Sequence, residues 1–202
     1  NSNSFINGTA NDSLYPISQS TYGGSGLIQV PTARFSDDGE FLFGVSSETP
    51  YNRLFAKAQI FPWMEVVLRY TEGRYLDYFP GSKQTWKDKG LDFRFKLFDE
   101  TNNMPAIAVG FNDFGGTGAY SSEFITANKR LGNLDLSLGI GWGRLDGVNH
   151  ISNPAGWFLD DKKVRGGYSA RGGKISTARL FSGENMSFFG GLEYYTPVPN
   201  LS

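Results

Sequence analysis

The chain has 202 residues, enough for one domain or for a piece of a larger one. Its formal net charge of −1 gives no electrostatic reason to expect nucleic acid as a partner, and its lack of cysteine excludes disulfides, thiolate metal sites and a thiol nucleophile. No run of 18 apolar residues occurs, so the sequence contains no candidate membrane helix. The 26 glycines and the 15% of aromatic residues instead favour strands joined by tight turns.

Residues 1–38 are polar and show little periodicity. The glycine-rich stretch at residues 23–26 lacks the Lys-Ser/Thr pair and the following helix that a phosphate-binding loop requires. We therefore expect a polar N-terminal arm, or a plug-like lead-in, over residues 1–38, followed by a β-domain over residues 39–202.

From residue 39 onward, short segments of alternating apolar and polar residues predict β-strands. The clearest runs from Leu134 to Trp142, where every second residue is apolar and the residues between them are Asp, Ser or Gly. Successive side chains of a strand point to opposite faces, so one face of this strand is apolar and ends in Trp142. Such a strand suits a wall with lipid outside and a filled or wet interior. Seven further strands are predicted near residues 40–45, 53–60, 64–70, 91–97, 106–111, 120–130 and 188–194.

The connections between the eight predicted strands differ in length. Two long loops, at about residues 71–90 and 144–186, are the third and seventh connections, so both lie at the same end of an up-and-down meander. Short turns at Phe61–Trp63, at 99–104 and at 131–133 lie at the other end. Short turns at one end and long loops at the other are typical of outer-membrane barrels.

Two hairpins predict the register between strands. Gly132 and Asn133 form a two-residue turn signal. This turn pairs Leu131 with Leu134, Ala127 with Leu138 and Ile125 with Ile140 on the apolar face, and Arg130 with Asp135 and Asn128 with Ser137 behind it. It also pairs Phe124 with Gly141, and we expect the Phe124 ring to cover that glycine. A second hairpin near Asn102 is predicted to pair Phe95 with Val109, Lys96 with Ala108 and Arg94 with Gly110.

The charged side chains on the inner face have two interpretations. They either form salt bridges that fill a narrow interior, or line a pore that selects or guides an anionic polymer, because cations outnumber anions on the second to fourth strands. The candidate pore-lining residues are Arg53, Lys57, Glu65, Arg69, Asp92, Arg94, Lys96, Asp135 and Glu193.

The aromatic residues of the two predicted long loops also allow two interpretations. Tyr75, Tyr78, Trp86 and Trp157 either stack on sugar rings at a mouth, or pack the loops and the membrane interface. No residue pattern indicates catalysis or a metal site. Asp160 and Asp161 are adjacent, so in a strand their carboxylates point apart, and His150 has no histidine or cysteine partner in the sequence.

Several blocks of the sequence resemble the YjbH/GfcD-type bacterial proteins. They are residues 26–34 with Asp38 and Gly39, residues 105–111 with 113–118, residues 121–123, and residues 189–200. The resemblance implies an outer-membrane β-barrel encoded with exopolysaccharide- or capsule-export partners, with no enzyme activity and no cofactor. Family members are longer and many begin with a lipidated cysteine, so we expect this chain to be an N-terminal portion whose anchor lies upstream or is absent.

The sequence thus predicts an all-β, antiparallel, up-and-down transmembrane β-barrel, or the first part of one, with its N-terminus in the periplasm. The predicted function is non-enzymatic export or surface assembly of an exopolysaccharide. The expected partners are outer-membrane lipid, the polymer and other export proteins, with no nucleic acid. A general diffusion porin is one alternative, and a soluble extracellular glycan-binding β-domain is another.

Overall fold

The computed structural model describes residues 15–147, 151–166 and 179–196. They form one large antiparallel sheet and a separate two-stranded sheet, with very little helix. The large sheet comprises β3 (Phe41–Glu48), β4 (Tyr51–Phe61), β5 (Met64–Asp77), β6 (Thr85–Phe98), β7 (Ala106–Asn112), β8 (Ser122–Leu131), β9 (Leu134–Gly143), β10 (Ile151–Ser152) and β11 (Asn185–Tyr194). His150 and residues 197–200 of the last resemblance block lie outside the described residues.

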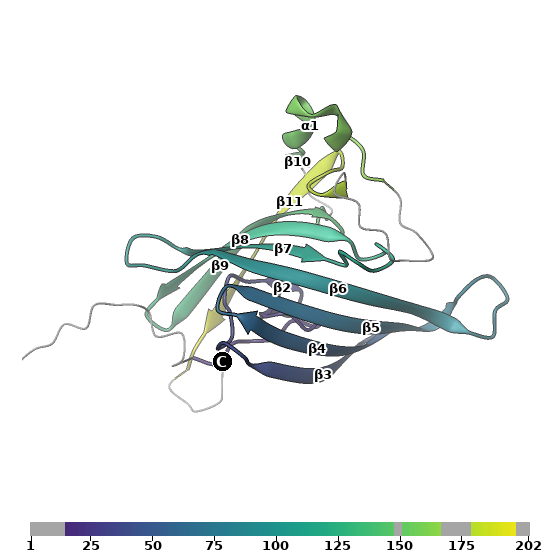
Figure 1. Cartoon of the computed structure of the whole chain (residues 1–202), viewed down its shortest axis with the longest axis horizontal. Coiled ribbons are helices and arrows are strands. Elements are labelled where there is room, and N and C mark those ends of the chain that lie inside the picture. The colour runs from purple at the N-terminus through teal and green to yellow at the C-terminus, as the bar shows by residue number, and fades with distance from the viewer. Residues whose placement is uncertain (1–14, 148–150, 167–178, 197–202) are drawn as a thin grey trace, which may run out of the picture.

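The order of the strands confirms the predicted meander. From β3 to β9 each strand pairs with the next one in the chain, and β11 pairs with β9 (Figure 1). The Gly132–Asn133 turn sets Leu131 against Leu134 and Arg130 against Asp135, as predicted. The second hairpin also has the expected register, since Phe95 pairs with Val109 and Arg94 with Gly110. The all-β, antiparallel fold class is therefore confirmed.

The sheet does not close into a barrel within the described residues. There, β3 pairs only with β4, and β10 pairs only with β11. The sheet is nevertheless curved. This curvature is evident because strands near both of its edges contact the same N-terminal segment on one face. The Ser46 hydroxyl of β3 donates to the backbone carbonyl of Thr21, and the Ser18 hydroxyl donates to Glu193 of β11.

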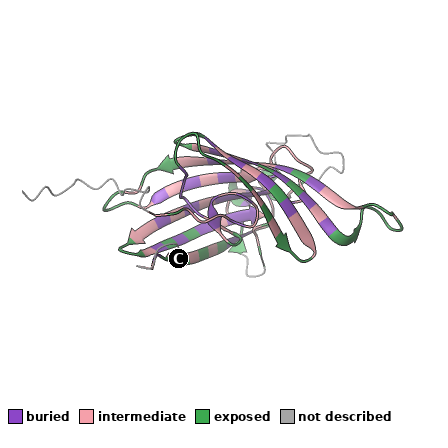
Figure 2. Cartoon of the chain, turned by 90° about the horizontal axis from the view of Figure 1, so that it is seen from below, coloured by how far each residue is buried: buried purple, intermediate pink, exposed green. Residues whose placement is uncertain are grey.

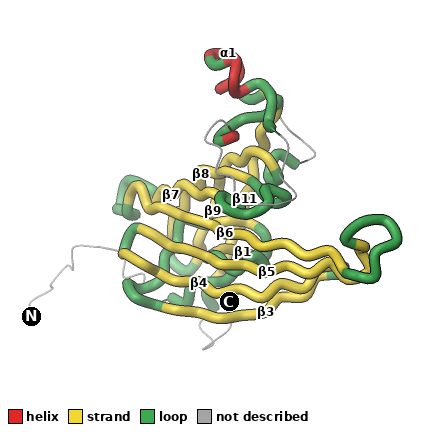
Figure 3. Tube along the Cα trace, turned by 45° about the vertical axis from the view of Figure 1, so that its right-hand side comes forward, coloured by secondary structure: helices red, strands yellow, loops and turns green. Residues whose placement is uncertain are grey.

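The prediction of a long loop at residues 71–90 is wrong. β5 and β6 continue through most of it, pairing Thr71 with Asp88 and Gly73 with Trp86, so that only residues 78–84 connect them. Figure 3 shows this hairpin extending well beyond its neighbours. The sequence signal was lost because the outward residues here, such as Lys87 and Lys89, are polar, whereas backbone pairing does not require apolar side chains.

Polarity across the large sheet is inverted relative to a water-soluble sheet. Phe43, Leu138 and Leu192 on one face are 78%, 64% and 66% exposed, whereas the carboxylate-bearing Glu65 on the other face is 0% exposed. More and less buried residues alternate along most strands of the large sheet (Figure 2). Charged side chains therefore form the interior of this fold, and apolar side chains form its outer face.

The segment from residue 15 to residue 38 lies on the inner, polar face of the large sheet. It contains the small hairpin of β1 (Gly26–Leu27) and β2 (Val30–Pro31). The Ser25 hydroxyl donates a 2.5 Å hydrogen bond to Glu65, and Asn128 accepts a 2.7 Å hydrogen bond from the Ala33 backbone. Polar contacts with at least four strands thus attach this segment to the sheet.

The connection between β9 and β11 folds back on the sheet. It contains α1 (Ala155–Phe158) and a short 3₁₀ helix, η2 (Asp160–Lys162). Trp142, which we expected to face lipid, is only 6% exposed because Phe181 packs edge-on against it at 5.0 Å and Asn153 accepts a 3.0 Å hydrogen bond from its indole. None of the helices among the described residues is long and apolar enough to cross a membrane.

Three phenylalanine rings on the inner face cover glycines directly across the sheet. Phe55 covers Gly44 and Phe189 covers Gly139. From the register we expected the Phe124 ring to cover Gly141 of β9. Phe124 does pair with Gly141, but its ring covers Gly110 of β7 instead. Each inward residue has a neighbour on both sides, and here Leu145 already occupies the space over Gly141.

Candidate functional site

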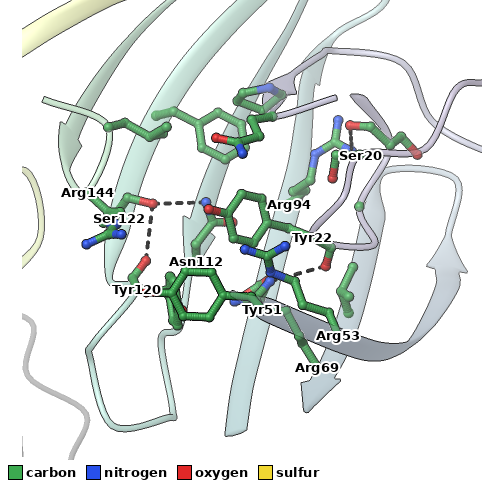
Figure 4. A pocket seen from close by; sticks show the side chains of 18 of the residues that line it. Ser20, Tyr22, Tyr51, Arg53, Arg69, Arg94, Asn112, Tyr120, Ser122 and Arg144 are labelled. Atoms are coloured by element: carbon green, nitrogen blue, oxygen red, sulfur yellow. Dashed lines mark hydrogen bonds and ion pairs between the residues drawn. The ribbon is translucent and has the colours of Figure 1, made fainter. Parts of the chain in front are cut away.

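A cavity of about 290 Å³ lies on the polar face, between the N-terminal segment and the large sheet. Its lining includes the start of β4, the end of β7 and the start of β8, so it opens toward the end of the sheet that carries the longer connections. The side chains that give this cavity its chemistry are Tyr22, Tyr51, Arg53, Arg69, Tyr120 and Arg144 (Figure 4).

Two of these arginines follow from the strand pattern. Arg53 of β4 and Arg69 of β5 are inward residues on adjacent strands, and they are 3% and 4% exposed. Arg144 comes directly after β9 and is exposed to solvent. Figure 4 shows Arg144 on the opposite side of the cavity from Arg53 and Arg69. The cavity is therefore flanked by guanidinium groups on both sides.

The arginines alternate with tyrosine rings. The Arg53 guanidinium lies 4.6 Å from the centroid of Tyr22 and 5.3 Å from that of Tyr51. Arg69 lies 5.2 Å from Tyr22 and 5.9 Å from Tyr120. Arg144 lies 5.4 Å from Tyr120. These are cation–π distances, and the contacts fix the planes of the guanidinium groups before any ligand arrives.

Acidic residues neutralise the deeper arginines. Arg69 donates two hydrogen bonds to Asp92, one of them 3.1 Å long. Arg94, which also lines the cavity, donates a 2.8 Å hydrogen bond to Glu65. Such pairs are necessary because an unpaired buried charge is costly. Arg53 has a weaker partner in Glu48, at 3.2 Å, whose side chain is 44% exposed.

Asp113 positions Tyr120 beside the cavity. It accepts a 3.0 Å hydrogen bond from the Tyr120 backbone N–H. Burial, together with the nearby carboxylates of Asp88 and Asp92, raises the pKa of Asp113 to about 6, against the opposing effects of the Tyr120 N–H and Arg69. Asp113 therefore changes its charge just below neutral pH.

The nine candidate pore-lining residues fall into separate groups. Arg53, Arg69, Asp92 and Arg94 line the cavity. Lys57 and Glu65 are buried under the N-terminal segment, where Lys57 donates a 2.6 Å hydrogen bond to Ser36. The remaining three, Lys96, Asp135 and Glu193, lie toward the end with the short turns.

At that end, charged side chains form a second polar cluster around Arg34. Arg34 donates two hydrogen bonds to Asp135 and lies 2.7 Å from Glu100. Burial by itself would raise the pKa of Glu100, but hydrogen bonds from the Arg130 backbone and from Arg34 outweigh burial and lower the pKa. Lys96 pairs with Asp99 at 3.0 Å nearby. This cluster attaches the N-terminal segment and has the character of a structural salt-bridge network.

The four candidate glycan-binding aromatics do not come together. Tyr75 and Tyr78 lie at the tip of the β5–β6 hairpin, and Tyr75 is 88% exposed. Trp157 lies in α1 and is 72% exposed. Trp86 packs edge-on against Tyr51 at 6.1 Å and Tyr120 at 5.9 Å, next to the cavity. Asp160 and Asp161 pair with lysines, and no group of acidic or histidine residues in the described ranges is placed to hold a metal ion.

The sequence did not indicate the tyrosines or Arg144 as site residues. Tyr51 is the first residue of β4, Tyr120 lies in the turn before β8, and Tyr22 belongs to the aperiodic N-terminal segment, so none of them stands within a clear alternation. The one available signal was the excess of arginine on the inner faces of β4 to β6, which pointed to the correct part of the sheet.

Comparison with known proteins places this arrangement in a family. The family described as "Exopolysaccharide biosynthesis protein YbjH" matches residues 18–202. The chain belongs to the YjbH family. A relative from Escherichia coli (strain K12), described as "Uncharacterized lipoprotein YjbH", is 40% identical over 185 residues. That match covers 89% of this chain and 26% of the relative, so the chain spans about a quarter of its length. No solved structure matches.

The description of the matching family names exopolysaccharide biosynthesis. The matched range begins at residue 18, so it includes the part of the N-terminal segment that contributes Tyr22 and Arg34 as well as the whole large sheet.

Proposed function

We propose that this chain contributes to the wall of an outer-membrane β-barrel that assists exopolysaccharide export or surface assembly without catalysing a reaction. The observation that carries the proposal is the inverted polarity of the sheet. A wide surface that includes Phe43, Leu54, Leu138 and Phe188 is exposed, at 57% to 78% for these four, while charged residues fill the interior. Soluble proteins rarely expose apolar patches of this extent, whereas lipid would cover this one without cost.

Aromatic residues at the end with the short turns support the same placement. Phe61 stacks on Trp63 at 5.2 Å, and Trp63 stacks on Phe95 at 6.2 Å. Phe61 and Trp63 are about half exposed. Aromatic belts of this kind occupy the boundary between lipid and water. The polar outward residues of the extended β5–β6 hairpin would then project beyond the apolar band at the opposite end.

The proposed orientation has the N-terminus in the periplasm. Gly39, which leads into β3, donates a 3.0 Å backbone hydrogen bond to Gln59 near the Pro62–Trp63 turn. The N-terminal segment therefore enters β3 at the end with the short turns, which is the periplasmic end in outer-membrane barrels. The description of the Escherichia coli relative as a lipoprotein is consistent with an envelope location.

The filled interior of the fold favours guided passage of a polymer over free diffusion of small solutes. The N-terminal segment and buried ion pairs occupy much of the polar face, and the cavity they leave measures about 290 Å³. A general porin would need a continuous aqueous channel. We therefore expect little conductance of small solutes. We also expect the protein to act together with other exopolysaccharide-export proteins.

Membrane fractionation of the intact protein, combined with gel mobility in detergent before and after boiling, tests the proposal. We expect the protein to sediment with outer membranes and to migrate differently after boiling, because a folded barrel resists detergent until heated. Loss of the exopolysaccharide on deletion of the protein, restored by the wild-type chain, would support the functional part. Recovery in the soluble fraction with unchanged mobility would overturn the proposal and leave the soluble glycan-binding domain as the better hypothesis.

A further inference from the structure

The cavity at the end with the longer connections has the size of a small-molecule site. Its volume of about 290 Å³ is near the lower limit for ligand pockets, which begin at about 300 Å³. It is bounded by residues of six strands of the large sheet, β3 to β8, and of the N-terminal segment, which are far apart in sequence. A pocket of this size accommodates a single sugar ring with its substituent and cannot enclose a length of polymer.

The charge balance of the cavity leaves a positive charge available. Asp92 and Glu65 neutralise Arg69 and Arg94 at hydrogen-bonding distance. Arg144 forms no ion pair with any residue in the described part of the chain and contacts the Tyr120 ring. Arg53 has only the exposed Glu48 as an acidic partner, and within the described ranges its Nε is buried without a hydrogen-bond acceptor. The cavity therefore suits one anionic group.

The polar and aromatic groups between the arginines suit a sugar ring. The Asn112 amide donates a 2.9 Å hydrogen bond to the Ser122 hydroxyl, and both line the cavity. Tyr51 and Tyr120 pack edge-on at 6.2 Å and supply apolar ring surface. A few well-placed polar groups on an aromatic lining are the usual composition of a specific small-molecule pocket.

We propose that this cavity binds a carboxylate-bearing sugar unit, a hexuronate, of the polymer on which the protein acts. The carboxylate lies at Arg144, because a guanidinium group forms paired hydrogen bonds with a planar carboxylate, and Arg53 faces the ligand from the opposite side of the cavity. The sugar ring lies against Tyr51 and Tyr120. This inference rests on the proposed function for the presence of a polymer, and it adds that the polymer is acidic and is recognised one unit at a time.

Because cation–π contacts already hold the arginines, binding loses little side-chain entropy. The site is thus organised before the ligand arrives. Trp86 packs against both Tyr51 and Tyr120, so its indole reports on occupancy of the cavity. We expect tryptophan fluorescence to change when a hexuronate oligosaccharide binds.

Isothermal titration of the purified protein in non-ionic detergent tests the inference with three probes. They are trigalacturonate, the neutral maltotriose of equal length, and glucose 6-phosphate as an anion that is not a carboxylate. We expect saturable binding of trigalacturonate, with maltotriose at least tenfold weaker. Equal binding of maltotriose would overturn the inference. Equal binding of glucose 6-phosphate would also overturn it, because the site would then recognise charge alone.

Two matched variants keep the result specific. Arg144→Gln removes an exposed arginine, so it leaves folding intact, and we expect at least a tenfold loss of affinity for trigalacturonate. Arg74→Gln removes the same charge from an exposed position of β5 outside the cavity, and we expect a change of less than twofold. Similar effects from both variants would assign binding to overall charge and reject the site.

The outcome separates this inference from the proposed function. Titration uses purified protein and does not depend on where the protein lies in the cell. If the protein fractionates as a barrel and supports the exopolysaccharide but binds no hexuronate, only the present inference fails. If it binds hexuronate through Arg144 but is soluble, the site stands and the barrel fails.

Discussion

Arg34 donates two hydrogen bonds, of 2.7 and 2.8 Å, to the carboxylate of Asp135, which lies 101 residues further along the chain. Both side chains are buried, at 4% and 2% exposure. The pair joins the N-terminal segment to the inner face of β9. It determines where this segment lies on the sheet and thereby helps to shape the cavity.

The first prediction concerns this pair. Arg34→Met should lower the free energy of unfolding by roughly 3–5 kcal/mol, because it leaves the Asp135 carboxylate buried with weaker partners. Urea denaturation in detergent measures the loss. Limited proteolysis should also cleave the N-terminal segment of the variant faster than that of the wild type.

Two comparisons make that result specific. The double variant Arg34→Met/Asp135→Leu should be more stable than Arg34→Met, because it removes the buried charge as well as its partner. Lys96→Gln, which breaks the solvent-accessible Lys96–Asp99 pair, should cost less than about 1 kcal/mol. A loss no greater than that of Lys96→Gln would show that Arg34 does not anchor the segment.

The second prediction concerns the close approach of Phe124 to Gly110. A Cβ at Gly110 would lie 2.1 Å from the Phe124 ring, and Phe124 is only 1% exposed. Gly110→Ala should therefore destabilise the protein by about 1–3 kcal/mol, as overpacking does. The double variant Gly110→Ala/Phe124→Leu should lose less stability than the sum of the losses of its two single variants, because the smaller side chain at position 124 relieves the clash. Additive losses would mean that the ring does not rest on Gly110.

The third prediction follows from Asp113. Its pKa is raised from 3.8 to about 6, so the folded protein binds this proton more tightly than the unfolded chain. The stability that this proton contributes is present in acid and is lost as the pH rises from about 4 through about 6. Above pH 7 the ionised carboxylate therefore destabilises the fold, by an amount on the order of 2 kcal/mol.

Asp113→Asn removes this charge and keeps an oxygen for the Tyr120 N–H. Asparagine also tolerates the positive φ of 52° at this position. The variant should gain stability over the wild type at pH 8 but much less at pH 5, in thermal unfolding followed by circular dichroism. Asp160→Asn, at an exposed position, should show no such pH dependence. The same difference between Asp113→Asn and wild type at both pH values would contradict the assignment.

The fourth prediction separates lipid from water as the solvent of the apolar face. Leu138 lies mid-strand in β9 and is 64% exposed. Leu138→Arg should cost about 2–4 kcal/mol in a bilayer and reduce the heat-modifiable, membrane-inserted fraction. In water the same change would be nearly neutral. Tyr75→Arg, at an 88% exposed position in the β5–β6 hairpin, is the control and should insert normally.

The sequence by itself determined the strands, their order and much of their register. The Leu134–Trp142 alternation assigned each side chain to a face, and the Gly132–Asn133 turn then set every pair between β8 and β9. These features are local, since a period of two residues and a two-residue turn need no distant partner. The pattern failed at residues 71–90, where polar outward side chains concealed paired strands.

Only the tertiary structure decided which neighbours pack against the side chains of each face. Periodicity points a side chain inward, but it does not say which neighbour that side chain covers, so Phe124 packs on Gly110 and not on Gly141. Nor does it predict the burial of Trp142 beneath Phe181. The cavity between Arg53 and Arg144 forms only when the curved sheet and the N-terminal segment meet. Its geometry depends on contacts between residues far apart in the chain, and local sequence patterns carry no record of those contacts.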